Sequence, residues 1–211
     1  MNTMKPVFME WLKTHWNPIL RAAGFKGSGT TFRRVSGAFA HVINIQSRSD
    51  GSRCCVNLGV QPQLQPIRGF SEAPDFDKIK EWNCEIRHRL TPATSECDYW
   101  WSFGSSEQEA RTNAASLIDV WNSRGEEFFR PYVQMPGPVA AATVADFESD
   151  RNNVFPTTKV LAVLLCARIC LETKDFARAV GFSEYGIRIC GGGWLDATFS
   201  DIIARCKGQI G

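Results

Sequence analysis

The stretch from Thr31 to Val60, TFRRVSGAFAHVINIQSRSDGSRCCVNLGV, decides the fold. It contains three runs of strand-forming residues, separated by Ser36-Gly37 and by Ser49-Asp50-Gly51-Ser52. Short turn signals between such runs indicate strands joined by hairpins, and Asp-Gly is a strong hairpin signal. The stretch therefore predicts an antiparallel β-meander.

Apolar and polar side chains alternate along the second and third of these runs. Phe39, His41, Ile43 and Ile45 share one side of the second run, and Cys54 to Val60 alternate in the same way. Residues that alternate along a strand lie on opposite faces of the sheet. We expect one apolar face and one polar face, the polar face offering a partner these residues: Asn44, Gln46, Arg48, Arg53 and Asn57.

Helical patterns precede and follow the meander. Apolar residues recur at helical spacing over residues 5–23, where Pro18 is expected to kink or split the helix. Ser106 and Glu109 form a capping-box pattern that opens a helix ending near Gly125. After Pro138 the patterns predict helices over 157–173, from Asp175 to about Cys190, and over 194–207. The predicted fold class is α+β, with an antiparallel-sheet domain over 1–135 and a helical extension over 136–211 packed on it.

Composition narrows the class of protein. No apolar run reaches the roughly 20 residues of a membrane span, and the N-terminal residues lack the pattern of a signal peptide, so we expect a cytoplasmic protein without a membrane partner. Eight cysteines are present without a C-x-x-C pair, which favours free buried thiols over disulfides or a zinc site. We predict no cofactor and no metal.

Charge is uneven along the chain, although the net charge is only +2. Residues 1–55 contain eight Lys and Arg against two Asp and Glu, whereas residues 70–150 contain seven against fifteen. The basic N-terminal segment and the acidic central segment could each bind a partner of opposite charge. The alternative, that the two regions face each other or solvent, stays open at this stage.

CEIRHRL, residues 84–90, is the densest polar motif and is expected to lie on a short helix. Arg87 and Arg89 could hold a carboxylate or phosphate of a partner, or pair with nearby acids such as Glu85 or Asp98. The spacing of Cys84 and His88 permits a metal site or a nucleophile–base pair, but no third ligand or orienting group stands nearby. We therefore predict no catalytic residues and no metal ligands.

Two further motifs could contribute to binding. YWWSF, residues 99–103, predicts a strand that places Trp100 and Trp101 on opposite faces, so one of them could anchor a partner. Both could also be covered by helices. GFKGSG, residues 24–29, contains the glycines of a phosphate loop but follows a helix and lacks the Lys-Ser/Thr ending, so it is expected to be a turn.

The order of these motifs resembles a known bacterial family, the domain of unknown function 4304. The resemblance runs from residue 17 to about residue 130 and is carried by NPILRAAGFKGSGTTFRR, VINIQSRSDGSRCCVNLGV, CEIRHRL, YWWSF, the helix over 106–124 and GEEFFRP. It implies an α+β fold with an antiparallel sheet and no established enzyme activity. Some members look like immunity proteins of bacterial toxin systems, which implies a protein toxin as partner.

Three functions follow as hypotheses. The first is a non-enzymatic immunity protein that occludes the active site of a cognate toxin, with Asn44, Gln46, Arg48, Arg53, Asn57, Glu85, Arg87, Arg89, Trp100 and Trp101 as candidate partner-binding residues. The second is an enzyme that binds a small molecule or nucleotide through Arg87, His88 and Arg89, together with His41 or Asn57. The third is an RNA or single-stranded DNA binder using the basic residues around the meander, which near-neutral charge argues against.

Overall fold

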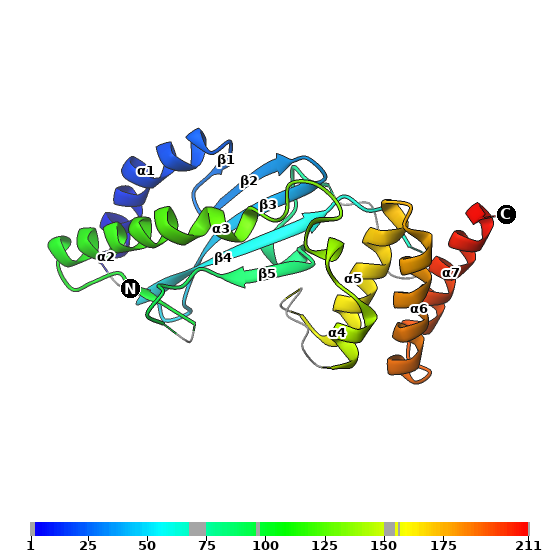
Figure 1. Cartoon of the computed structure of the whole chain (residues 1–211). Coiled ribbons are helices and arrows are strands. Elements are labelled where there is room, and N and C mark those ends of the chain that lie inside the picture. Colours follow the sequence, from blue (N-terminus) through cyan, green and yellow to red (C-terminus); the bar gives the residue numbers. More distant parts are fainter. Residues whose placement is uncertain (1–2, 68–74, 96–97, 150–154, 156, 211) are drawn as a thin grey trace. The chain divides into compact units, whose positions relative to one another are not determined.

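The structure is a computed structural model that describes residues 3–67, 75–95, 98–149, 155 and 157–210. A helix and four strands come first, two short strands follow, and helices complete the chain (Figure 1). The bounds are α1 Lys5–Ala22, β1 Lys26–Ser28, β2 Thr31–Ser36, β3 Phe39–Ser47, β4 Arg53–Pro62, η1 Glu81–Asn83, β5 Ile86–Arg89, β6 Trp101–Ser102, α2 Glu107–Val120, η2 Trp121–Gly125, α3 Glu126–Phe129, η3 Gly137–Ala140, α4 Val144–Glu148, α5 Lys159–Glu172, α6 Phe176–Cys190 and α7 Asp196–Ile210.

The predicted meander forms the centre of an antiparallel sheet. Its strands lie in the order β1-β2-β3-β4-β5, and β6 also pairs with β4. Phe32 of β2 lies opposite Ile43 of β3, and Leu58 of β4 lies opposite His88 of β5. Sheet and helices together confirm the α+β fold class, including the helices at the C-terminal end.

One face of the sheet is covered by α1 and α2, which pack against each other (Figure 1). α1 buries Phe8, Leu12, Trp16 and Leu20, which recur every four residues as a single apolar stripe. The helix continues through Pro18, so the alternative of a split at this residue is wrong. Trp16 and Leu20 on either side of the proline are fully buried, and their packing compensates for the missing backbone hydrogen bond.

α2 begins as predicted but ends at Val120, before the predicted end near Gly125. The Ser106 side chain accepts a hydrogen bond from the Glu109 N–H, and the Glu109 carboxylate accepts one from the Ser105 N–H instead of completing the capping box. Beyond Val120 the chain forms the π-helical turn η2 and then α3. A Cβ atom on Gly125 would lie 2.3 Å from Cε3 of Trp121, so the missing side chain lets the indole lie against the backbone.

CEIRHRL is not a helix. η1 ends at Asn83, and Ile86 to Arg89 form β5 on the edge of β4. The polar residues Glu85, Arg87 and Arg89 alternate with Ile86 and His88, which is the period of a strand. Pairing with β4 satisfies the backbone hydrogen-bonding groups of this segment and buries Ile86 fully. The segment is therefore a strand, and the side-chain pairs expected four residues apart on a helix do not form.

The C-terminal helices follow the predicted pattern closely. α5 contains nine consecutive buried residues from Ala162 to Cys170, as expected for a helix covered on all sides. The Asp175 side chain caps α6 by accepting from the Arg178 N–H, and Gly191 ends α6 in a left-handed conformation. α6 packs against both α5 and α7.

The chain divides into two compact units. One comprises Met1–Gln61 and Phe76–Pro131, and the other comprises Pro62–Asp75 and Tyr132–Gly211. The segment Pro62–Asp75 therefore groups with the C-terminal helices, although it lies between two strands of the sheet in sequence. The division into 1–135 and 136–211 stays a prediction.

Two findings concern the whole described chain. None of the described helices combines the length and the apolar composition that crossing a lipid bilayer requires. Seven cysteines lie in the described part of the chain and all are free thiols, while Cys97 lies outside it.

Candidate functional site

The residues predicted to bind a partner are largely brought together on the sheet face opposite the helices. Asn57 lies across from Arg89 in the β4–β5 pair, and Gly59 lies across from Arg87. The alternation along each strand therefore places six of the predicted residues on this face: Asn44, Gln46, Arg53, Asn57, Arg87 and Arg89. Trp100 joins them, because the Arg89 guanidinium lies 5.2 Å from the centroid of its ring.

A hydrogen-bonded row crosses three strands on this face. The Asn57 amide donates to Gln46 Oε1 at 2.9 Å, and Asn57 Oδ1 accepts from Arg89 Nε at 3.2 Å. Arg89 then pairs through Nη1 with Asp98, at 2.5 Å. Asn57 is only 6% exposed, whereas the side chains of Arg89 and Asp98 are 25% and 66% exposed. The buried Asn57 side chain thus fixes the position of the Arg89 guanidinium, and the charged groups of Arg89 and Asp98 remain accessible to solvent.

Glu81 and Gln61 complete this face and were not singled out from the sequence. The Glu81 carboxylate lies 3.9 Å from Arg87 Nη1. Burial raises the pKa of Glu81, although the positive charges of Arg87 and Arg89 act to lower it. The Gln61 amide donates to the Glu85 carboxylate at 2.9 Å and accepts from the Glu85 N–H at 3.1 Å. Glu85 is thus held in place by a reciprocal pair of bonds.

The other predicted contacts lie apart from this row. Trp101 is buried, and its strand partner is Cys54. Arg48 pairs with Asp50 in the turn between β3 and β4. The Asn44 amide donates to the Thr31 hydroxyl on the neighbouring strand.

Part of the polar face is covered rather than open. Ala40 and Val42 pack against Ile79 and Cys84, with Phe76 beside them. The segment that follows residue 75 therefore folds over one end of the face and leaves the Arg89 row outside this cover. Ala40 and Val42 are apolar residues at polar-face positions of β3, but the sequence does not show which segment covers them.

The residues of the enzyme hypothesis are divided between the two faces of the sheet, since Arg87, Arg89 and Asn57 share the polar face but the two histidines do not. His88 stacks on Phe128 and His41 stacks on Phe129, both on the helix side of the sheet. Cys84 lies on the opposite side, where burial raises its pKa to about 12. Among the described residues, no group of three or more His, Cys, Asp or Glu side chains is placed to hold a metal ion.

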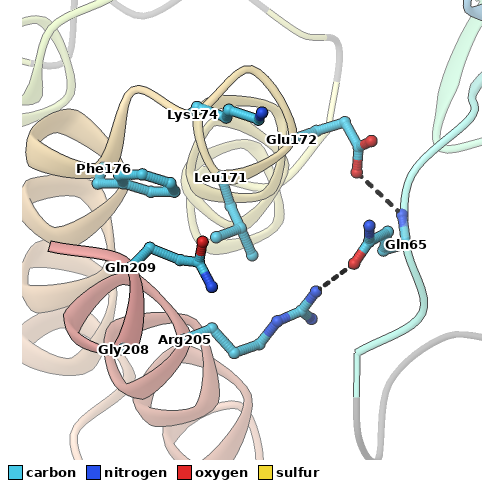
Figure 2. Close-up of a pocket in the computed structure, with 8 residues that line it drawn as sticks. All are labelled: Gln65, Leu171, Glu172, Lys174, Phe176, Arg205, Gly208 and Gln209. Atoms are coloured by element: carbon cyan, nitrogen blue, oxygen red, sulfur yellow. Dashed lines mark hydrogen bonds between the residues drawn. The ribbon is translucent and has the colours of Figure 1, made fainter. Parts of the chain in front are cut away.

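A pocket of about 530 Å³ lies within the helical unit, near the C-terminal ends of α5 and α7 (Figure 2). Figure 2 shows Gln65 between two helical side chains: its N–H donates to the Glu172 carboxylate at 3.3 Å, and its Oε1 accepts from Arg205 Nη2 at 2.7 Å. Leu171 and Phe176 supply apolar surface, and Lys174 adds a second cation. The Glu172 carboxylate and the Arg205 guanidinium are thus already bonded to Gln65 of the same unit.

The first unit is thus an α+β domain whose sheet is covered by helices on one face and carries a polar row on the other. The family model for a domain of unknown function (DUF4304) matches residues 16–129, which is more than half of the chain, and the chain belongs to this family. α5, α6 and α7 lie outside the matched segment. No curated protein and no solved structure matches the chain.

Proposed function

We propose that this protein is a non-enzymatic binding protein that acts in the bacterial cytoplasm as an immunity protein and occludes the active site of a protein toxin. The observation that carries the proposal is the fixed position of Arg89, whose guanidinium donates to Asn57 and lies over the Trp100 ring. Arginine and tryptophan are enriched among the few residues that contribute most of the affinity of protein interfaces, and a side chain already ordered loses little entropy on binding.

The chemistry of the row indicates what the toxin presents. Exposed Arg87 and partly exposed Arg89 favour a carboxylate-rich rim on the partner, and Arg53 on the same face adds a third positive charge. Asp98 would exchange its bond with Arg89 for solvent or for a donor on the toxin. The Trp100 ring offers the apolar contact at the centre of such an interface.

The immunity role itself rests on the resemblance of some family members to immunity proteins. It is supported by the polar row, whose Cys55 thiol donates to the Asn57 and Gln46 amides and has a pKa raised by burial, so it is a weak nucleophile. The cytoplasmic setting is supported by the free thiols of the described chain.

The test begins with affinity purification of the tagged protein from its native cells and mass spectrometry of what it retains. We expect one stoichiometric partner that is toxic when expressed alone and harmless when this protein is co-expressed. A preparation without a partner, or a retained partner whose toxicity persists on co-expression, would contradict the proposal.

Variants then locate the interface. Arg89→Gln is expected to weaken partner binding about tenfold or more, because it removes a charged contact at the centre of the row. Arg111→Gln is the matched control, since Arg111 is an exposed, ion-paired arginine on α2. Trp100→Ala tests the same site without touching the Arg89–Asn57 bond. Equal affinities for the two arginine variants would place the interface elsewhere.

A further inference from the structure

A second hollow lies at the β1 edge of the sheet, away from the Arg89 row. It has a volume of about 310 Å³ and is lined by Gly24, Lys26, Gly27, Arg33, Arg34, Val35, Phe76 and Asp77. Three of these residues are cations and one is a carboxylate. The lining therefore carries more positive than negative charge.

The cations of this hollow differ in how they are engaged. Arg34 is neutralised by a bidentate pair with Glu126. Arg33 is held through Nε by the Ile79 carbonyl at 2.5 Å, which leaves its terminal Nη groups without a hydrogen bond to any described residue. Within the same described chain, the Lys26 ammonium has neither a hydrogen-bond nor an ion-pair partner. A fixed guanidinium fork beside an unpaired ammonium is the donor set that binds phosphate.

The loop beside these cations leaves room for an anion. Gly24 has a φ of +85°, and a Cβ there would meet no atom within 4 Å, so the backbone at this point borders open space. Arg21 donates to the Phe25 and Gly27 carbonyls from the helix side. These two bonds occupy carbonyl oxygens of the loop, and the Arg21 guanidinium adds a positive charge beside the loop.

The size and walls of the hollow indicate more than a bare ion. About 310 Å³ is the lower end of the range for small-molecule pockets and exceeds what one phosphate group fills. Val35 is 60% exposed, and Phe76 packs on the buried cluster around Ile79. These two side chains form an apolar wall next to the cations.

We infer that this hollow binds a small phosphate-bearing molecule, with Lys26 and Arg33 on the phosphate and Phe76 and Val35 against its apolar body. The sequence suggested these cations as part of an open nucleic-acid surface, together with Arg48 and Arg53. The structure instead gathers Lys26, Arg33 and Arg34 around a hollow of their own. The inference is independent of the proposed toxin binding, because it uses none of the residues of the Arg89 row.

The test is isothermal titration of the full chain with adenosine monophosphate, inorganic phosphate and adenosine, at low and at raised salt. Saturable binding of the monophosphate that weakens with salt supports the site. Phosphate bound as tightly as the monophosphate would identify the free ion as the source of the same chemistry. Absence of saturable binding by both phosphate compounds at millimolar concentration would overturn the inference.

Two substitutions make the test specific. Lys26→Ala is expected to weaken binding about tenfold, because it removes a charged donor, and it leaves no partner unpaired. Val35→Asp places a carboxylate at the exposed apolar wall and should abolish binding. Lys13→Ala on α1 is the control, since Lys13 is an exposed lysine outside the hollow.

The outcomes separate clearly. Loss of binding in Lys26→Ala and Val35→Asp with retention in Lys13→Ala supports the site. Equal weakening by Lys26→Ala and Lys13→Ala would show a diffuse charge effect and overturn it. An RNA oligonucleotide that binds more tightly than the monophosphate and is unaffected by Val35→Asp would overturn the small-ligand assignment in favour of an open surface.

Discussion

Arg34 on β2 and Glu126 on α3 are joined by two hydrogen bonds, of 3.0 and 2.7 Å, although they are 92 residues apart in the chain. The guanidinium also lies 4.4 Å from the ring centroid of Phe25 and donates to the Ala23 carbonyl. Only 16% of the Arg34 side chain is exposed. A single side chain thus connects the sheet, the end of α1 and the helix that follows the π turn.

The first prediction concerns this pair. Glu126→Gln should lower the free energy of unfolding by about 1–2 kcal/mol, because it leaves the largely buried Arg34 guanidinium without its charged partner. Glu127→Gln removes the neighbouring exposed carboxylate and should change stability little. Chemical denaturation of both variants measures the difference, and equal midpoints would show that the pair contributes nothing.

The second prediction compares two glycines of α6. A Cβ on Gly186 would lie 2.2 Å from Cζ of Phe199 on α7, whereas a Cβ on Gly181 would meet nothing within 4 Å. Gly181→Ala should stabilise by about 0.5–1 kcal/mol through helix propensity. Gly186→Ala should destabilise by about 1–3 kcal/mol, because Phe199 must move. Thermal unfolding of the two variants decides, and stabilisation by both would contradict the tight α6–α7 contact.

The third prediction concerns pH. Burial raises the pKa of Glu81, so the folded state binds its proton more readily than the unfolded state does. Stability should therefore fall as the pH rises from the ordinary glutamate pKa of 4.5 through the raised folded value. Glu81→Gln should remove this part of the pH dependence and should be relatively more stable at neutral pH. Unfolding curves between pH 4.5 and 7.5 test this, with the exposed Glu10→Gln as control; parallel pH profiles for wild type and Glu81→Gln would refute it.

The fourth prediction concerns thiol reactivity. Burial raises the pKa of both Cys54 and Cys84 to about 12, so neither forms a thiolate at neutral pH. Cys190 is partly exposed and should be alkylated first of these three. Peptide mapping after brief iodoacetamide treatment of the native protein gives the order directly. Labelling of Cys84 as fast as Cys190 would show that the segment over the sheet opens.

The meander could be predicted because its signals are local. Asp50-Gly51 lies in the turn between β3 and β4, and the Asp50 carboxylate accepts hydrogen bonds from Ser52. The helix predicted for CEIRHRL was wrong because a segment of seven residues fits both a strand and a helix. Only the pairing with the open edge of β4 decides that it forms a strand. Asn57 and Arg89 could be predicted from the sequence as candidate binding residues. Their contact could not, because it depends on the pairing of two strands in which these residues are 32 positions apart.

The cover over the polar face was beyond sequence reasoning for a different reason. Ile79 and Phe76 stand in a Pro-rich stretch without periodicity, so no pattern indicates which surface they bury. The hollow beside Lys26 has the same origin, since Phe76 completes a wall that β1 and β2 begin. Tertiary contacts of an irregular segment create both features.

The grouping of Pro62–Asp75 with the C-terminal helices means that the polypeptide passes between the two units more than once. The matched family segment, residues 16–129, encloses this stretch, yet Gln65 is bonded to Glu172 and Arg205 beyond its end. Cutting the chain after Pro131 would keep all residues of the first unit but would separate Gln65 from its partners Glu172 and Arg205. A fragment that ends with the family match would therefore contain one segment of the second unit without the helices to which Gln65 is bonded.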